Sequence, residues 1–301
     1  MDPEKIAFIG LGHMGLPFCR NLIAKGYEVH GFDIATQALE ALEAAGGRAA
    51  RSVSDACSKA DYVITMLPDG NVVRDVLTAP DVLAAISRSA VVIDMSSSEP
   101  FATRQLGASL AKHGIALIDA PVSGGVKRAN EGSVSIMAGG ESETIDRVRG
   151  VLTAVGSKLF EMGPLGSGHA VKALNNYVSA AGLQAACEAL LVTEVFGIDA
   201  SEFVDVLNQS TGRNNSTETK IKPFILSGTY ASGFGLSLMA KDIRNAEKLA
   251  QALDVSAPGL TASADFWTKA AQLSDADADH TEIYRFMGET LNGRRLTAGG
   301  D

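Results

Sequence analysis

The chain has 301 residues, of which 46% are hydrophobic and 20% are charged, and its net charge is −9 at neutral pH. This composition provides for a large buried core and excludes a mainly disordered chain, while the length allows about two domains. The acidic balance leaves no basic surface to neutralise phosphates, so we expect no nucleic-acid partner.

The cysteines and histidines predict neither a disulfide framework nor a metal site. The three cysteines are far apart in the sequence, and the five histidines lack the spacing of metal ligands. So few cysteines are typical of a protein from a reducing compartment. Because the first apolar stretch begins at Ile6, with no signal peptide before it, we expect a cytoplasmic location.

The first predicted strand runs directly into a glycine-rich motif. Residues 6–15 read IAFIGLGHMG, an apolar stretch followed by G-x-G-x-x-G, and a helical pattern and a second apolar stretch over 27–32 come next. This strand–turn–helix–strand context predicts a dinucleotide site, although an ordinary turn without a ligand is the alternative. The candidate cofactor residues here are Gly10, Leu11, Gly12, His13, Met14 and Gly15.

Three of these positions have specific expected roles. Gly10 permits the tight turn, Gly12 lets the backbone approach a pyrophosphate, and Gly15 lets the helix pack closely on the strand. The N-terminus of the following helix supplies amide donors and positive dipole for the phosphates.

Asp33 follows the second predicted strand and indicates which cofactor binds. An acid at this position accepts hydrogen bonds from the ribose hydroxyls of NAD and repels the 2′-phosphate of NADP. The next residues, Ile34, Ala35 and Thr36, offer no positive charge for that phosphate. The alternative is that Asp33 caps the following helix, and both roles can coexist, since Thr36 is also a suitable cap. We therefore expect NAD, with NADP less favoured.

Up to about residue 160, apolar runs alternate with helical patterns. Runs that are apolar throughout, joined by helices, predict a parallel sheet covered on both faces, which is the doubly wound α/β architecture. The sequence Ser98-Glu99-Pro100 places a helix cap just before a proline. The predicted strands are 6–10, 28–32, 62–66, 90–94, 116–119, 133–138 and 158–160.

After Gly168 the pattern becomes helical to the end of the chain. An Ala- and Leu-rich stretch over 170–196 is long enough to suggest a membrane span, but polar and charged residues interrupt it, so a buried helix is the better interpretation. We place the domain boundary at 165/166, giving a dinucleotide-binding domain over 1–165 and an all-helical domain over 166–301. Further helices are predicted over 201–208, 241–253, 259–271 and 281–291.

A second motif follows the strand that ends at Asp119. Residues 119–126 read DAPVSGGV, which places Ser123, Gly124 and Gly125 at the carboxyl edge of the sheet, where ligands bind in such folds. Two glycines and a serine expose backbone amides and a hydroxyl, which suit a carboxylate. A simple turn at Pro121 is the alternative, and these residues alone favour it.

The third motif places a lysine within an apolar helix. Residues 166–176 read GSGHAVKALNN, and in a helix Lys172 and Asn176 lie one turn apart on the same face. A lysine in such surroundings must find a partner or lower its pKa, which is what a proton-transfer lysine requires. The alternative is a lysine whose stem packs while its ammonium group reaches water.

A fourth stretch, 233–242, reads GFGLSLMAKD, and by itself it predicts a loop leading into a helix with Lys241 and Asp242 at its solvated start. Taken together, the four stretches resemble the β-hydroxyacid dehydrogenase family over essentially the whole chain. The resemblance implies that Lys172 is the catalytic residue, with Asn176 beside it in the substrate site. Ser123, with the two glycines after it, would then hold the substrate carboxylate.

The same resemblance implies further cofactor contacts from Leu67, Pro68 and Ser97, which follow predicted strands, and from Lys241, which would close over the cofactor. The helical domain would supply the substrate pocket and the contacts of a homodimer or homotetramer, with the site in the cleft between the domains. The segment 210–216 is more similar to the 3-hydroxyisobutyrate branch of the family than to its reductase branch.

The expected reaction is a reversible, NAD-dependent hydride transfer between nicotinamide and a small β-hydroxy acid or its semialdehyde, with Lys172 handling the proton. One alternative is a semialdehyde reductase, for tartronate or succinic semialdehyde, that works mainly in the reductive direction. Another is a dinucleotide-binding module without catalysis. A 6-phosphogluconate dehydrogenase would have His where this chain has Asn175, and an imine reductase would replace Lys172.

Overall fold

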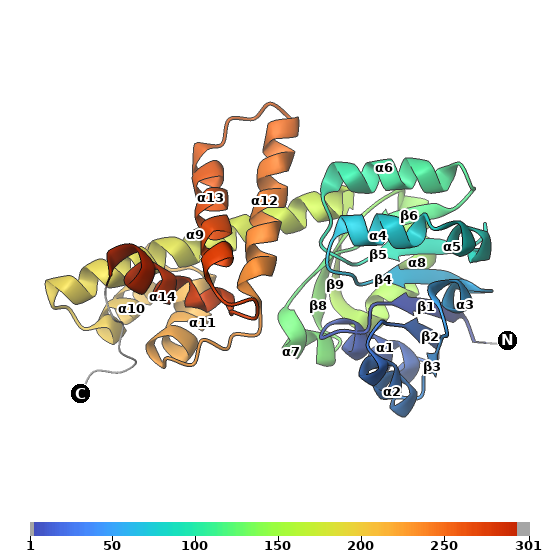
Figure 1. Ribbon diagram of the computed structural model, residues 1–301, viewed down its shortest axis with the longest axis horizontal. Helices are drawn as coiled ribbons and strands as arrows, with labels where there is room; N and C mark the ends of the chain where they lie inside the picture. The colour runs from blue at the N-terminus through green and yellow to red at the C-terminus, as the bar shows by residue number, and fades with distance from the viewer. Residues whose placement is uncertain (1–2, 294–301) are drawn as a thin grey trace. The chain divides into compact units, whose positions relative to one another are not determined.

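The computed structural model describes residues 3–293, and the chain divides into two compact units, Met1–Lys172 and Ala173–Asp301 (Figure 1). The division lies inside helix α9 (Ser167–Phe196), whereas the sequence placed the change at 165/166. The start of α9 belongs to the first unit because the backbone there is hydrogen-bonded to Asp119 of that unit.

The first unit is built on one sheet with the strand order β3-β2-β1-β4-β5-β6-β8-β7, and β9 pairs with β8. The strands β3, β2, β1, β4, β5 and β6 are parallel to one another. Strand β8 runs antiparallel to β6 and β7, so the prediction of a sheet that is parallel throughout is wrong at this edge. The two shortest strands have two residues each, too few to give a sequence pattern, and were not predicted. The strands are β1 (Lys5–Ile9), β2 (Glu28–Phe32), β3 (Arg48–Ala49), β4 (Tyr62–Thr65), β5 (Val91–Asp94), β6 (Ala116–Asp119), β7 (Val122–Ser123), β8 (Val134–Gly139) and β9 (Gly156–Gly163).

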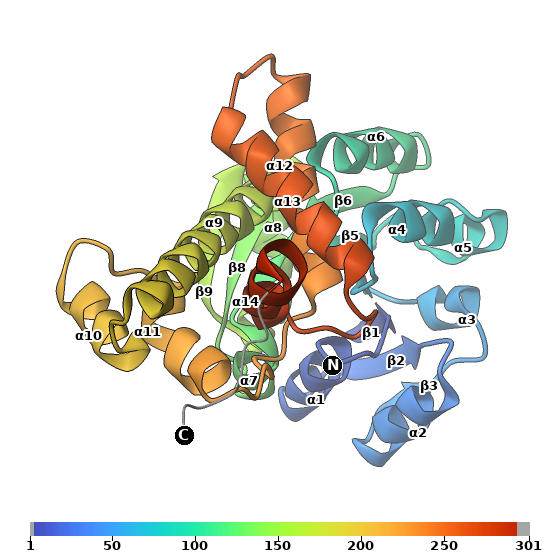
Figure 2. The same ribbon diagram turned by 60° about the vertical axis from the view of Figure 1, so that its left-hand side comes forward.

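Helices cover both faces of this sheet (Figures 1 and 2). Side chains alternate along each strand, so Ile6 and Phe8 of β1 enter one apolar core while Ala7 and Ile9 enter the other. The first core packs against α1 (Gly15–Ala24), α2 (Thr36–Ala44), α7 (Gly125–Asn130) and α8 (Ser142–Val155). The second packs against α3 (Val53–Cys57), α4 (Gly70–Leu77), α5 (Pro80–Ala85) and α6 (Pro100–Ala111). The predicted doubly wound architecture is confirmed.

The second unit is helical, and its core surrounds the buried side chains of Leu183, Leu190, Ile243 and Trp267. The sequence predicted one helix over 281–291, but this segment is a 3₁₀ turn, a short α-helical turn and a π-helical turn in succession. Figure 2 shows α12 and α13 lying side by side. Besides α9, the elements are α10 (Ala200–Gln209), α11 (Asn215–Thr219), η1 (Ile221–Leu226), α12 (Leu236–Ala252), α13 (Pro258–Leu273), η2 (His280–Glu282), α14 (Ile283–Arg285) and η3 (Phe286–Leu291).

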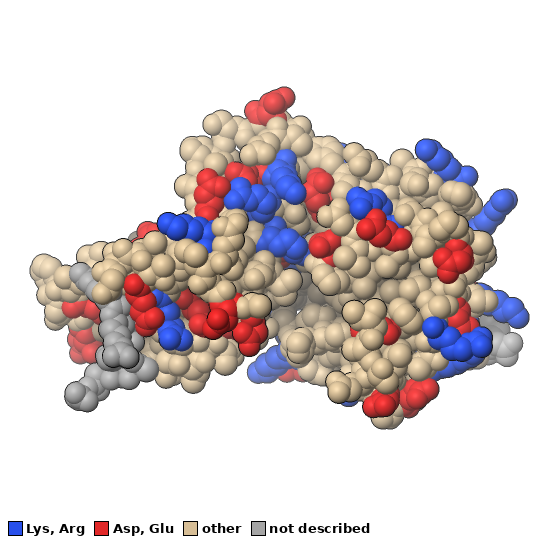
Figure 3. Space-filling view, in the orientation of Figure 1, with Lys and Arg blue, Asp and Glu red and all other residues tan. Residues whose placement is uncertain are grey.

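By length and composition, α9 is the one helix among residues 3–293 that could cross a membrane. One side of it, including Ala180, Leu183, Cys187 and Leu190, is instead buried in the core of the second unit. The predicted buried helix is therefore confirmed for one side only, since Val178, Val192 and Phe196 are exposed. Charged groups of both signs are interspersed on the face of the molecule drawn in Figure 3, with no continuous basic surface there.

Candidate active site at the carboxyl edge of the sheet

The glycine-rich turn after β1 has the close contacts that its motif predicts. Gly10 has a φ of +96°, and a Cβ on it would lie 2.3 Å from the carbonyl oxygen of Met66. A Cβ on Gly15 would lie 2.0 Å from the carbonyl oxygen of Gly10, so α1 could not pack here with a larger residue. A Cβ on Gly12 would meet no atom within 4 Å, which leaves open space for a pyrophosphate beside the backbone. The turn therefore fits a dinucleotide.

Asp33 lies directly after β2 and is joined to the glycine-rich turn. Its Oδ2 accepts a hydrogen bond from the backbone N–H of Leu11 at 2.7 Å, and its Oδ1 accepts one from that of Ala35 at 2.9 Å. The alternative that Asp33 or Thr36 caps α2 is wrong, because the helix begins at Thr36 after Ala35, with no side-chain cap. The next residue, Ile34, is uncharged and 96% exposed.

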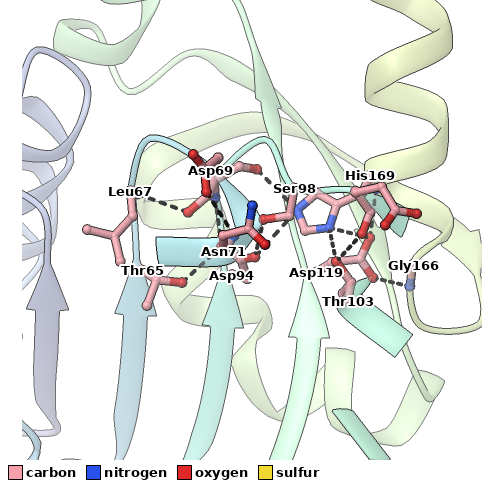
Figure 4. A network of polar contacts seen from close by, with 12 residues as sticks. Thr65, Leu67, Asp69, Asn71, Asp94, Ser98, Thr103, Asp119, Gly166 and His169 are labelled. Atoms are coloured by element: carbon pink, nitrogen blue, oxygen red, sulfur yellow. Dashed lines mark hydrogen bonds and ion pairs between the residues drawn. The ribbon is translucent and has the colours of Figure 1, made fainter. Parts of the chain in front are cut away.

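The loops after β4 and β5 are bound to each other at the same edge of the sheet (Figure 4). Asp94, at the end of β5, accepts hydrogen bonds from the hydroxyls of Thr65 and Ser98 at 2.9 and 2.8 Å. The backbone N–H of Leu67 donates to the hydroxyl of Ser96 at 2.9 Å. These bonds fix the segments that carry the predicted cofactor residues Leu67, Pro68 and Ser97.

Asp119, at the end of β6, anchors the start of α9 (Figure 4). Its Oδ1 accepts a hydrogen bond from the backbone N–H of Gly166 at 2.6 Å, and its Oδ2 accepts one from that of His169 at 2.7 Å. Burial raises the pKa of Asp119, while the nearby His169 and these two N–H groups oppose that shift. A Cβ on Gly168 would lie 2.1 Å from the carbonyl oxygen of Met137, so glycine is required for this close approach.

The segment with Ser123 is more than a turn. Val122 and Ser123 form β7, which pairs with β8, and α7 begins at Gly125. Gly124 has a φ of +143°, a conformation that favours glycine, and a Cβ on Gly125 would meet no atom within 4 Å. Ser123 is half-buried and both glycines are exposed, so a hydroxyl and backbone amides are accessible to a small anion.

Lys172 and Asn176 both lie on α9, one turn apart, and are 9% and 6% exposed. The amide nitrogen of Asn176 donates to Oδ2 of Asp242 at 2.6 Å, and the ammonium group of Lys241 lies 3.3 Å from Oδ1 of the same carboxylate. Because α12 begins at Leu236 and Asp242 is only 2% exposed, the prediction of a solvated helix start at Lys241 and Asp242 is wrong. The second unit thus joins two predicted site residues, Asn176 and Lys241, through Asp242.

A polar cluster that no sequence motif predicts holds the loop before α12. Asp279 accepts hydrogen bonds from the backbone N–H groups of Gly233 and Phe234 and from the hydroxyl of Ser232. His280 lies 2.8 Å from the ammonium group of Lys220, and burial lowers the pKa of that lysine. No motif marks these residues, because their partners are far away in the sequence.

Two protein families match the chain. The family described as the NAD binding domain of 6-phosphogluconate dehydrogenase covers residues 5–163. The one described as the NAD-binding of NADP-dependent 3-hydroxyisobutyrate dehydrogenase covers residues 166–287.

Proteins with assigned names match nearly the whole chain. An NAD-dependent L-serine dehydrogenase of Pseudomonas aeruginosa is 34% identical over 95% of this chain and 99% of its own. A 3-sulfolactaldehyde reductase of Escherichia coli is 34% identical over 92% of this chain and 94% of its own. The solved structure of 3-hydroxyisobutyrate dehydrogenase from Mycobacterium tuberculosis with L-serine has a TM-score of 0.87 and 36% identity, covering 95% of this chain and 99% of that one.

These matches favour neither alternative to the main prediction, the mainly reductive semialdehyde reductase or the module without catalysis. The glycine-rich turn with its open space, the anchored start of α9 and the buried Lys172 agree with an enzyme that binds NAD. The chain belongs to the β-hydroxyacid dehydrogenase family, and it is an NAD-dependent oxidoreductase that acts on the CH–OH group of a small hydroxy acid.

Proposed function

We propose that this enzyme interconverts a β-hydroxy acid of the 3-hydroxyisobutyrate type and its semialdehyde. Relatives support this choice, because one is named an L-serine dehydrogenase and the M. tuberculosis 3-hydroxyisobutyrate dehydrogenase was solved with L-serine. Both compounds carry a carboxylate and a primary alcohol, so a site for them needs an anion clamp and a proton acceptor.

We assign cofactor binding, apart from Lys241, to the domain over 1–165, and the substrate pocket, apart from the carboxylate clamp, with the subunit contacts to the domain over 166–301. When bound, the nicotinamide supplies the hydride acceptor for oxidation and the hydride donor for reduction. The residues proposed to hold the cofactor are Gly10, Leu11, Gly12, His13, Met14, Gly15, Asp33, Leu67, Pro68, Ser97 and Lys241.

The observation that carries the proposal is the burial of Lys172 and Asn176 on one face of α9. The amine of Lys172 would accept the substrate hydroxyl proton during oxidation and return it to the carbonyl oxygen during reduction. Asn176 would hold the substrate oxygen beside that amine, with its own amide oriented by Asp242. The hydroxyl of Ser123 and the amides of Gly124 and Gly125 would bind the substrate carboxylate.

Substitution of Lys172 tests this role. Lys172→Ala should reduce kcat by about 10²–10⁴-fold with NADH binding retained. Lys172→Arg should not rescue turnover, because a guanidinium group stays protonated and cannot act as a base. Lys172→Met preserves the apolar stem, so kcat within a few-fold of native for this variant would mean that the lysine only packs.

The substrate is tested by an NAD-linked screen over 3-hydroxyisobutyrate, serine, glycerate, 4-hydroxybutyrate and 3-hydroxypropionate, with the matching semialdehydes in reverse. We expect the highest kcat/KM for a compound whose hydroxyl is on the carbon β to the carboxylate, as in 3-hydroxyisobutyrate. A clear preference for 4-hydroxybutyrate would contradict the substrate class.

We also propose a homodimer or homotetramer in the cytoplasm. A stripe of exposed apolar residues on α9 recurs at intervals of three, four or seven positions, a spacing that suits packing of one helix on another. A groove of about 540 Å³ borders the end of this stripe and is lined mainly by apolar residues. The apolar stripe on α9 proposed as the subunit contact consists of Val171, Leu174, Val178, Ala185, Val192 and Phe196.

The cytoplasmic location is supported by the buried free thiols of Cys19, Cys57 and Cys187, which suit a reducing compartment.

A further inference from the structure

His169 is a buried imidazole in the first turn of α9, and the proposed function gives it no role. It is 1% exposed and lies three residues before Lys172 on the same helix. Its Nε2 is 3.1 Å from the carbonyl oxygen of Ser96, and its Nδ1 is 2.9 Å from the hydroxyl of Thr103 (Figure 4). The ring therefore connects α9 to the loop after β5 and to α6.

The chemistry of these partners determines the bonds. A carbonyl oxygen only accepts, so Nε2 carries a proton and donates it to Ser96. The hydroxyl of Thr103 donates to Nδ1 when that nitrogen carries no proton. When Nδ1 is protonated, the hydroxyl accepts from it and donates to the carbonyl oxygen of Glu99, 3.1 Å away. Both ring nitrogens thus have partners, and the ring orientation is fixed.

Two buried carboxylates flank the same ring. Oδ2 of Asp94 is 3.8 Å from Nε2, and Oδ2 of Asp119 is 3.7 Å from Nδ1. Each carboxylate organises one of the two segments that His169 joins, since Asp94 holds the hydroxyl of Ser98 and Asp119 holds the N-terminal turn of α9. His169 is therefore the side chain that links these two anchors.

We propose that His169 is a positioning residue that sets Lys172 relative to the cofactor-binding loop over 96–98. Because α9 is a continuous helix, a shift of its first turn is passed to Lys172 one turn later. Displacement of a reacting group by about 1 Å can cost roughly 100-fold in rate, even when binding is unchanged. The inference rests on the proposed proton-transfer role of Lys172.

Substitution of His169 should therefore lower kcat more than it weakens binding. For His169→Ala we expect kcat to fall about 10–100-fold, with the Kd for NADH and the KM for the hydroxy acid within about threefold of native. Asp94 retains its own bonds to Thr65 and Ser98, so the cofactor loop stays in place. The exposed His113, replaced by Ala, is the matched control and should leave kcat unchanged.

Two further variants separate positioning from a loss of folding. His169→Gln can donate to Ser96 and accept from Thr103, so it should recover most of kcat. Thr103→Val removes the partner of Nδ1 and the contact with Glu99 but keeps the Ser96 partner of His169 and preserves volume, so it should give a smaller loss of kcat than His169→Ala. A native kcat in His169→Ala, or a Gln variant as impaired as the Ala variant, would overturn the proposal.

A double-mutant cycle with Lys172→Ala identifies the residue through which His169 acts. If His169 works through Lys172, adding His169→Ala to the Lys172→Ala enzyme should change kcat less than twofold. A further 10–100-fold loss in the double variant would show that His169 acts by another route, and would overturn the proposal. A different result, a near-native kcat in Lys172→Ala alone, would contradict the proposed function itself.

Discussion

Gly168→Ala is the most direct test of whether the start of α9 positions the proposed catalytic residue Lys172. The new Cβ would lie 2.1 Å from the carbonyl oxygen of Met137 and 2.9 Å from Oδ2 of Asp119, whereas Cβ contacts under 3.0 Å essentially never occur. The first of these neighbours is backbone in β8, which cannot turn aside. The first turn of α9 must therefore move by about 1 Å, a displacement that can cost roughly 100-fold in rate when it reaches the reacting group.

We expect kcat for the hydroxy acid to fall about 100-fold, with a stability loss of about 1–3 kcal/mol from overpacking. NADH fluorescence titration should give a Kd near native, because the glycine-rich turn is untouched. Gly182→Ala in the same helix is the control, since the nearest neighbour of its Cβ would be the side chain of Asn214, at 3.3 Å, and its kcat should stay within twofold of native. Gly168→Ala with a kcat within threefold of native would refute the reasoning.

Three other predictions follow from the site and from α9. Ser123→Ala should lower kcat/KM for the hydroxy acid about 10–100-fold by removing one donor to a charged group, with Kd for NADH unchanged; an equal loss with an alcohol that lacks the carboxylate would contradict the clamp. The native enzyme should prefer NAD over NADP in kcat/KM by at least about tenfold, and Asp33→Asn with Ile34→Arg should reverse the preference; equal efficiency of the native enzyme with both cofactors would contradict this. Sedimentation at micromolar concentration should show an oligomer that Val192→Lys weakens and Val206→Lys, on α10, does not; a native monomer of about 31 kDa would contradict the apolar stripe as an interface.

The fold could be predicted largely from the sequence, because its elements carry local signals. The predicted strands over 28–32 and 116–119 match β2 and β6, since β6 is an apolar run that ends at Asp119 and β2 follows the strand and helix of the glycine-rich motif. The antiparallel pairing of β8 with β6 could not be predicted, because strand direction depends on which strands meet in space. The single helix predicted over 281–291 failed because its pattern of apolar residues does not distinguish α-helical from 3₁₀ or π-helical turns.

The site divides in the same way. Motif residues such as Gly10 and Lys172 could be predicted as site residues, because the glycine spacing and the apolar surroundings are visible in the sequence. Their partners could not, because those bonds join distant positions: Asp119 is 50 residues from His169, and Asp242 is 66 residues from Asn176. Asp242 was even assigned to a solvated helix start, since a Lys-Asp pair gives no sign that the carboxylate is buried against another helix.

These partners give the G-x-G-x-x-x-K motif a physical explanation that differs from that of the glycine-rich cofactor turn. At Gly12 the absence of a side chain leaves space beside the backbone, which suits a ligand. At Gly168 the absence of a side chain permits close packing instead, because the backbone of α9 approaches β8 and Asp119 too closely for any Cβ. The second glycine of this motif thus serves packing, and the lysine four residues later gains its position from that packing. If Lys172 is the proton-transfer group, as proposed, the motif specifies its position as well as its identity.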